Sequence, residues 1–113
     1  MDLSFEVTER NGHAVLRVEG EVDVASAAQL REQLIQLIDL GYQQVVVDLD
    51  DTRFLDSTGL GVLVGGLKRL RNQQGELALV CTQRDLLTVF NITGLAKAFH
   101  IHASVDSAVT GPS

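Results

Sequence analysis

The chain has 113 residues, of which 45% are hydrophobic and 21% are charged, and its formal net charge is −6 at pH 7. A chain of this size suits one domain, taken here as residues 1–113 with an ordered core from about residue 3 to 109, and is too short for two separate cores. The negative charge and the lack of any Lys/Arg cluster argue against direct binding of nucleic acid or of an anionic membrane surface.

The first predicted unit is a β-hairpin. Residues 3–8 alternate between apolar and polar side chains, which is the period of a half-buried strand. Asn11-Gly12 is the preferred pair of a two-residue type I′ turn, and residues 14–21 resume the alternation.

Residues 24–40 change to a helical period. The apolar stripe consists of Ala27, Leu30, Leu34, Leu37 and Ile38. Ser26 and Gln29 have the spacing of a capping box, and Gly41 is a natural helix stop. A strand at residues 45–50 follows, so the strand–helix–strand order predicts a right-handed crossover and parallel pairing.

A second helix is predicted from residue 57 to 72, followed by a strand at 77–81. The apolar stripe of this helix consists of Leu60, Leu63, Val64, Leu67 and Leu70. Cys81 is the only cysteine, which excludes an internal disulfide, and its apolar neighbours predict a core position.

The C-terminal part contains one more predicted helix, in which Thr82 and Asp85 have capping spacing and Gly94 marks the end. A short strand, a final helical stretch and a frayed tail are then predicted at 99–102, 104–109 and 110–113.

Polar residues alternate with apolar ones in the second, third and fifth predicted strands. They are Arg17 and Glu19, Asp48 and Asp50, and His100 and His102. Strands of a parallel sheet covered on both faces are usually apolar throughout. We therefore expect an α/β fold in which an N-terminal β-hairpin leads a mixed, mostly parallel sheet of about four to five strands with helices mainly on one face. The other face is then at least partly solvated, or available for docking.

The segment from residue 50 to 61 is the richest in candidate functional side chains, and it lies at the carboxyl end of the third predicted strand, where partners and ligands gather. Ser57 or Thr58 is placed to cap the following helix. A phosphoryl group on Ser57 would gain from the helix N-terminus but would be repelled by Asp56. Because like charges opposed at an interface cost several kcal/mol, phosphorylation here would change partner binding by orders of magnitude.

The helix after this segment is unusually rich in glycine. It contains Gly59, Gly61, Gly65 and Gly66. On a helical projection Thr58, Gly61 and Gly65 lie together outside the apolar stripe, with Val62 beside them. Two interpretations have equal weight: a smooth surface that a partner's backbone approaches closely, or close packing against another helix of this domain.

Residues 54–61, Phe-Leu-Asp-Ser-Thr-Gly-Leu-Gly, resemble the phosphorylation loop of STAS domains in bacterial anti-sigma factor antagonists. Residues 20–23, Gly-Glu-Val-Asp, and residues 90–95, Phe-Asn-Ile-Thr-Gly-Leu, resemble two further elements of the same family, in the same order. The resemblance covers essentially the whole domain and agrees with the fold expected above.

The resemblance implies that the unphosphorylated protein binds an anti-sigma factor, usually a GHKL-type serine kinase, and thereby releases the sigma factor. The kinase then uses ATP to phosphorylate Ser57, the modified protein is released, and a PP2C-type phosphatase restores it. The partner-binding residues it implies are Asp23, Asp56, Ser57, Thr58, Gly59 and Gly61, with Val62 beside them. It implies a binding module that is not an enzyme and needs no cofactor, and a monomer or weak dimer.

Hydrolysis by Ser57 would require a nearby base. His13 belongs to the hairpin, and nothing in the pattern pairs His100 or His102 with Ser57, so an enzyme is disfavoured. His100 and His102 at i, i+2 are a weak metal signal without a third ligand.

A receiver-like phosphoaspartate site among Asp48, Asp50 and Asp51 is also disfavoured. Receivers open with a strand–helix unit and need a late Lys, whereas this chain opens with a hairpin and has only Lys97 near its end.

The main rival keeps the fold and changes the partner. Other STAS domains are small subunits bound to the ATPase of a lipid-trafficking ABC transporter, or scaffolds in stress-sensing complexes, and fold alone does not decide. The intact Asp-Ser-Thr-Gly segment favours the phosphorylation switch.

No stretch approaches the roughly 20 apolar residues needed to cross a bilayer. Residues 1–6 lack the features of a signal peptide, so a cytoplasmic protein is expected.

Overall fold

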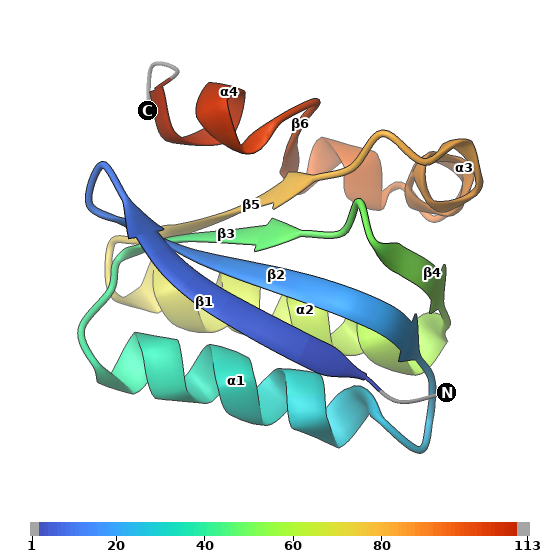
Figure 1. Ribbon diagram of the computed structural model, residues 1–113, viewed down its shortest axis with the longest axis horizontal. Coiled ribbons are helices and arrows are strands. Elements are labelled where there is room, and N and C mark those ends of the chain that lie inside the picture. The colour runs from blue at the N-terminus through green and yellow to red at the C-terminus, as the bar shows by residue number, and fades with distance from the viewer. Residues whose placement is uncertain (1–2, 111–113) are drawn as a thin grey trace.

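A computed structural model describes residues 3–110 of the chain (Figure 1). The strands are β1 (Ser4–Arg10), β2 (His13–Val22), β3 (Gln44–Asp48), β4 (Thr52–Leu55), β5 (Glu76–Val80) and β6 (His100–His102). The helices are α1 (Ala27–Asp39), α2 (Ser57–Asn72), α3 (Arg84–Ile92), the short 3₁₀ turn η1 (Leu95–Lys97) and α4 (Val105–Thr110). Most of the predicted tail, residues 111–113, lies outside the described residues, while Thr110 ends α4.

The strands form one sheet in the order β1-β2-β3-β5-β6, with β4 paired to β2 outside this path. β1 and β2 are antiparallel and every other pair is parallel. This confirms the predicted α/β fold with a leading hairpin, and the sheet of six strands has one more than expected. The hairpin turn is also as predicted, because Asn11 and Gly12 both have positive φ, 56° and 80°.

β2 is long enough to have two parallel partners in succession. Its first half pairs with β3, as in Leu16 with Val47, and its last residues pair with β4, as in Val22 with Leu55. The register shifts between Gly20 and Glu21. As a result the carboxyl ends of β2 and β4 lie side by side, and each leads directly into a helical segment.

β4 is the strand that the sequence did not predict. It has only four residues and directly follows two acidic residues that are typical of a loop. Its one fully buried polar residue is Thr52, whose Oγ1 donates a hydrogen bond to the Val18 carbonyl at 2.8 Å, while Phe54 is 48% exposed. Leu55 is the one apolar residue of β4 that points into the core, so the usual alternation of buried apolar and exposed polar residues is missing from this strand.

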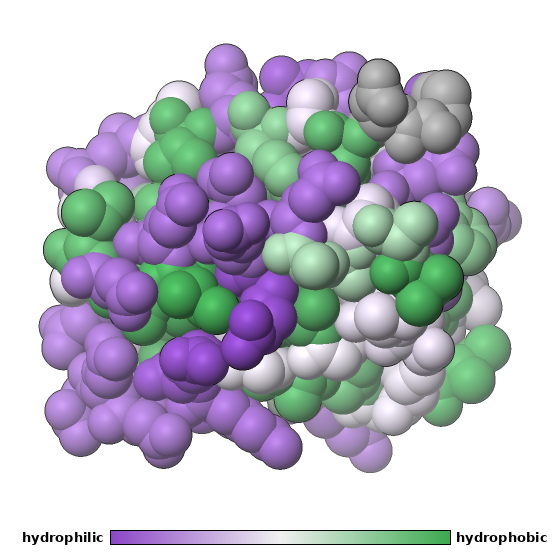
Figure 2. Space-filling model, turned by 90° about the horizontal axis from the view of Figure 1, so that it is seen from below, coloured by the Kyte–Doolittle hydropathy of each residue, from purple (hydrophilic) through white to green (hydrophobic). Residues whose placement is uncertain are grey.

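The helices α1 and α2 cover one face of the sheet and enclose the main core (Figure 1). All of the predicted α1 stripe is buried, and so is the α2 stripe apart from the half-buried Val64. Seen from this helical side, the surface mixes hydrophobic areas and pale areas of intermediate hydropathy with hydrophilic side chains (Figure 2). On the opposite face α4 covers a smaller cluster formed by Val15, Val46, Val80 and Val109. The helices thus lie mainly on one face, as predicted.

The ends of α1 and α3 are as predicted, and the start of α3 is not. Gly41 and Gly94 follow α1 and α3 with φ of 99° and 78°, the left-handed conformation expected at helix ends. The capping pair Thr82 and Asp85 is wrong: Gln83 is the N-cap of α3, and its side chain makes no capping bond. The backbone N–H and the hydroxyl of Thr82 instead donate to Oδ1 of Asp50, at 2.8 and 3.1 Å.

Cys81 is buried in the core as predicted, and burial raises the pKa of its thiol. Among residues 3–110, no helix combines the length and apolar character required to cross a membrane.

Candidate functional site

The candidate site lies at the sheet edge where β2 and β4 end. The N–H of Asp56 donates to the carbonyl of Val22 at 3.1 Å, and Val22 is paired with Leu55. Asp23 and Asp56 therefore follow two hydrogen-bonded strand ends, as expected from the sequence for Asp23. Two acidic residues, each at the start of a helical segment, lie at this edge.

The N-cap of α2 is Asp56, so the prediction that Ser57 or Thr58 caps this helix is wrong. Oδ1 of Asp56 accepts hydrogen bonds from the N–H groups of Thr58 at 2.9 Å and Gly59 at 3.1 Å. The backbone of Asp56 is extended, with φ −93° and ψ −174°, as N-cap residues require. Asp56, Ser57 and Thr58 are all chemically able to cap a helix. Because β4 ends at Leu55, the cap lies at Asp56, one residue earlier than the sequence pattern predicted.

Because Asp56 supplies the cap, Ser57 is the first residue of α2 and its side chain is not used by the helix. Ser57 is exposed, and within residues 3–110 its hydroxyl makes no hydrogen bond. The helix N-terminus next to it carries partial positive charge from unpaired N–H groups. The half-buried Asp56 carboxylate adjoins the same point and opposes a second anion.

The start of α1 uses the same residue types in another way. Oδ1 of Asp23 accepts from the N–H groups of Ala25 and Ser26, at 2.9 and 3.1 Å. The Ser26 hydroxyl lies 3.0 Å from the Glu21 carbonyl, to which it donates, and accepts from the N–H of Asp23 at 3.0 Å. Ser26 is the N-cap residue but makes no side-chain cap bond, so the predicted capping box with Gln29 is wrong.

The predicted strip of Thr58, Gly61 and Gly65 has both of its glycines in open space, whereas the other two glycines of α2 pack inside the domain. A Cβ on Gly59 would lie 2.5 Å from Cδ1 of Leu55, and one on Gly66 would lie 3.2 Å from Leu34, so both glycines allow close packing inside the domain. Gly61 and Gly65 are exposed, and a Cβ on either would meet no neighbour within 4 Å among residues 3–110. These two leave an open surface beside the half-buried Val62, one turn beyond Ser57.

Two exposed apolar residues at this edge were not among the predicted site residues. Phe54 is 48% exposed two residues before Asp56, and Val24 is 79% exposed directly after Asp23. Exposed aromatic and aliphatic side chains grouped near polar ones are typical of contact surfaces. Phe54 is part of the motif at residues 54–61, but its outward direction became visible only once β4 was known.

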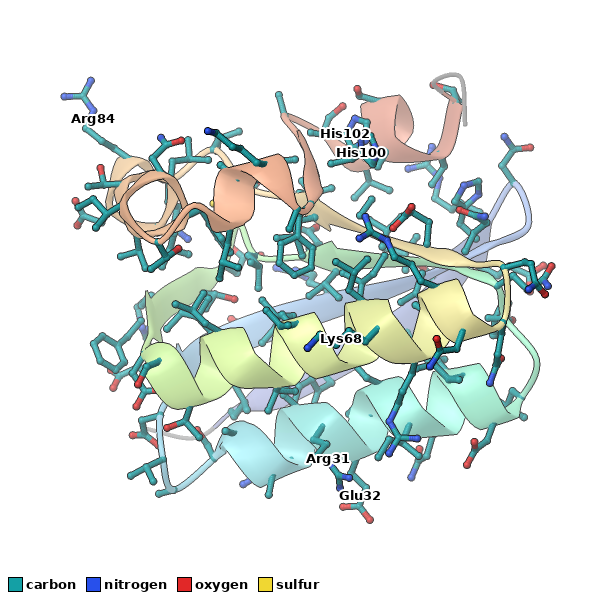
Figure 3. The ribbon with its side chains drawn as sticks, turned by 180° about the vertical axis from the view of Figure 1, so that it is seen from behind. Arg31, Glu32, Lys68, Arg84, His100 and His102 are labelled. Atoms are coloured by element: carbon teal, nitrogen blue, oxygen red, sulfur yellow. The ribbon has the colours of Figure 1, made fainter. Side chains whose placement is uncertain are left out.

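The three histidines lie elsewhere. His13, His100 and His102 line one cavity of about 500 Å³ that β3, β5, α4 and the hairpin turn also border. His13 begins β2 and Val22 ends it, so this cavity and Ser57 lie toward opposite ends of that strand. In the view from behind, His100 and His102 lie beneath α4 (Figure 3). No set of three or more His, Cys, Asp or Glu side chains within residues 3–110 is placed to hold a metal ion.

The three aspartates considered above as a receiver-like site each accept a hydrogen bond within the domain. Asp50 binds Thr82, and Oδ2 of Asp51 accepts from Nε of Arg17 at 2.7 Å. Oδ1 of Asp48 accepts from the N–H of Asp50 at 3.0 Å, and burial raises the pKa of the Asp48 carboxyl.

Comparison with known proteins agrees with this geometry. The family model described as STAS domain matches residues 4–108. The anti-sigma-B factor antagonist of Bacillus subtilis is 36% identical over 109 residues, which cover 96% of this chain and 99% of that protein. The crystal structure of an anti-sigma factor antagonist from Mycobacterium paratuberculosis superposes with a TM-score of 0.90 at 26% identity, covering 96% of this chain and 92% of that one.

The same fold occurs in the Bacillus cell fate determinant SpoIIAA in its phosphorylated form, with a TM-score of 0.72 at 23% identity over 94% of this chain and 96% of that one. The family match and the full-length relatives are decisive together. The chain belongs to the STAS domain family of anti-sigma factor antagonists.

Proposed function

We propose that this protein is an anti-sigma factor antagonist whose binding is switched off by phosphorylation of Ser57. The unphosphorylated form binds an anti-sigma factor of the GHKL serine-kinase type and releases the sigma factor. The kinase transfers the γ-phosphoryl group of ATP to the Ser57 hydroxyl oxygen, with loss of its proton and formation of ADP. A PP2C-type phosphatase then hydrolyses the phosphoserine and restores the binding form.

The observation that carries this proposal is the free hydroxyl of Ser57. Asp56 satisfies the N–H groups of Thr58 and Gly59, so Ser57 is exposed at the helix start without a structural task. A kinase can therefore modify Ser57 without unfolding α2. The full-length relatives named anti-sigma-B factor antagonist support the choice of partner class.

The charge of the phosphate explains how modification would end binding. Phosphorylation adds about −1.5 to −2 charge units at neutral pH, next to the carboxylate of Asp56 and at the edge that also holds Asp23. A partner surface suited to the neutral serine would then face an unmatched dianion. Opposition of this kind costs several kcal/mol, which corresponds to a loss of affinity of a hundredfold or more at about 1.4 kcal/mol per factor of ten.

The remaining predicted site residues divide by exposure. We propose that Asp23, Thr58, Gly61 and Val62 contact the partner, together with the exposed Phe54. Gly59 is buried against Leu55 and Val22, and its proposed role is to let the loop pack closely onto the sheet.

The test is reconstitution with a GHKL-type anti-sigma kinase from the same organism and its sigma factor. Without ATP, the protein should displace the sigma factor from the kinase, as measured by size-exclusion chromatography of the three components. With ATP the sigma factor should return to the kinase, and addition of a PP2C-type phosphatase should release it again. Failure to displace the sigma factor, with tight binding to an ABC-transporter ATPase instead, would contradict the proposal and favour the transporter-subunit alternative.

A further inference from the structure

A groove of about 210 Å³ lies between α1 and α2 on the helical side of the molecule shown in Figure 2. Its apolar lining includes Leu34, Ile35 and Ile38 from α1 and Val62 from α2. Arg31 and Arg69 also line it, one from each helix. The volume is below the range of about 300–1,000 Å³ typical of small-molecule pockets, so the shape suits a protein segment lying along it better than an enclosed ligand.

The two arginines lie at different levels along the groove. Both α1 and α2 start at the carboxyl edge of the sheet and end near the start of β3, so they run in the same direction (Figure 1). A Cβ on Gly66 would lie 3.2 Å from Leu34, so Gly66 of α2 and Leu34 of α1 lie at about the same height along the two helix axes. Arg31 precedes Leu34 by three residues and Arg69 follows Gly66 by three, which separates their Cα positions by about 9 Å along the helix axes at roughly 1.5 Å per residue.

Both guanidinium groups lack a partner within the described part of the chain. Neither Arg31 nor Arg69 forms an ion pair or hydrogen bond among residues 3–110, whereas Arg17 pairs with Asp51 and Arg71 with Glu76. Glu32, next to Arg31, extends from the side of α1 away from α2 (Figure 3). α2 itself contains no acidic residue, although the chain as a whole carries a net charge of −6. The groove is therefore a basic, apolar surface on an acidic protein.

We propose that this groove binds an amphipathic helix of a protein partner that carries carboxylates at both ends of its apolar stripe. The apolar stripe would lie on Leu34, Ile35 and Val62, and two carboxylates seven residues apart, about 10.5 Å along a helix, would reach Arg31 and Arg69. An acidic occupant suits the groove best, because its carboxylates would pair with the two exposed guanidinium groups, which would repel a basic occupant.

The groove begins at Thr58, beside the phosphoacceptor. Naming the anti-sigma factor as the source of the helix rests on the proposed function. With the anti-sigma factor as the source, a phosphate on Ser57 would adjoin the end of the groove and repel the acidic helix, which would contribute to release.

The experiment uses two synthetic helical peptides as probes with the full, ¹⁵N-labelled chain. One has a Leu/Ile stripe with Glu at two positions seven residues apart, and the other has Lys at the same two positions. The protein variants are Arg31→Glu/Arg69→Glu and the control Lys68→Glu, which reverses one positive charge on α2 outside the groove lining.

The Glu peptide should shift the amide signals of the groove residues, and the double variant should bind it at least about tenfold more weakly while Lys68→Glu binds it as the wild type does. The double variant should in turn prefer the Lys peptide. The proposal would be overturned if the Glu peptide shifted no groove signals, or if the double variant and Lys68→Glu lost equal affinity for it. Concentration-dependent self-association that the double variant abolishes would also overturn it, in favour of a second copy of this chain as the occupant.

The same variants separate this inference from the proposed function. Phosphorylation of Ser57 by the kinase together with unchanged kinase affinity in the double variant would overturn the anti-sigma factor as the source of the helix and leave the switch intact. Binding of the Glu peptide in the groove without any phosphorylation of Ser57 would overturn the phosphorylation switch and leave the groove proposal intact.

Discussion

The starts of α1 and α2 use the same two residue types with opposite results. At α1, Asp23 accepts backbone hydrogen bonds and the hydroxyl of Ser26 is held between the Glu21 carbonyl and the Asp23 N–H. At α2, Asp56 accepts the equivalent backbone bonds, and Ser57 is exposed with a hydroxyl that has no hydrogen-bond partner in the described part of the chain. One serine is part of the structure and the other is available for chemistry.

The spacing between aspartate and serine explains the difference. Ser26 is three residues after Asp23, so the turn brings its side chain back over the strand end. Ser57 directly follows Asp56 and begins the helix, where its side chain points outward and the cap is already occupied. An acidic cap followed at once by serine therefore keeps the helix stable while leaving a hydroxyl free.

The largest expected effect is on partner binding through Ser57. Ser57→Asp adds a negative charge at the free position and should weaken binding to the anti-sigma factor at least about 100-fold. Ser57→Asn has nearly the same shape without the charge and should retain most of the affinity. Isothermal titration calorimetry with the anti-sigma factor measures both, and equal losses in the two variants would show that shape rather than charge controls binding.

The two kinds of glycine in α2 provide the next test. Gly59→Ala places a Cβ 2.5 Å from Leu55 and 2.8 Å from Val22 and should lower the free energy of unfolding by about 1–3 kcal/mol. Gly61→Ala meets nothing and should raise it by up to about 1 kcal/mol through helix propensity. Urea denaturation measures both, and a destabilised Gly61→Ala would show that this position is packed rather than open.

The cap of α2 is expected to have a smaller effect on stability. Asp56→Ala removes the acceptor for the Thr58 and Gly59 N–H groups and should lower the free energy of unfolding by about 0.5–2 kcal/mol. Asp56→Asn keeps an acceptor oxygen and should lower the free energy of unfolding by only a few tenths of a kcal/mol. If Asp56→Ala were as stable as the wild type in thermal denaturation, Asp56 would not be the cap.

The smallest effect separates the two serines directly. Ser26 is 9% exposed and its hydroxyl is bonded on two sides, so Ser26→Ala should lower the free energy of unfolding by about 1 kcal/mol. Ser57→Ala removes an exposed, unbonded hydroxyl and should change stability by less than about 0.5 kcal/mol. A larger loss in Ser57→Ala than in Ser26→Ala, measured by chemical denaturation, would reverse the assignment of the two roles.

Much of the fold was predictable because its signals are local and repeated. The Asn11-Gly12 turn, the apolar stripes of α1 and α2 and the stops at Gly41 and Gly94 each depend on period or on turn chemistry. β4 was missed because a buried Thr52 and an exposed Phe54 reverse the usual pattern over a strand of four residues.

The details of the site depend on neighbours that are remote in sequence. Asp56, Ser57 and Thr58 are all able to cap, and only the pairing of Leu55 with Val22 determines which one does. The glycines of α2 likewise divide according to what they face: Leu55 and Val22 for Gly59, and open space for Gly61. The motif was sufficient to locate the segment, whereas the structural role of each residue in it depends on tertiary contacts.

The most direct test of the central claim is intact mass measurement and peptide mapping after incubation with a GHKL-type anti-sigma kinase and ATP. The account predicts a single phosphate on Ser57, unchanged in Ser26→Ala and Thr58→Ala and absent in Ser57→Ala. A phosphate on Thr58 or Ser26, or no phosphate in a protein that the kinase binds tightly, would contradict it.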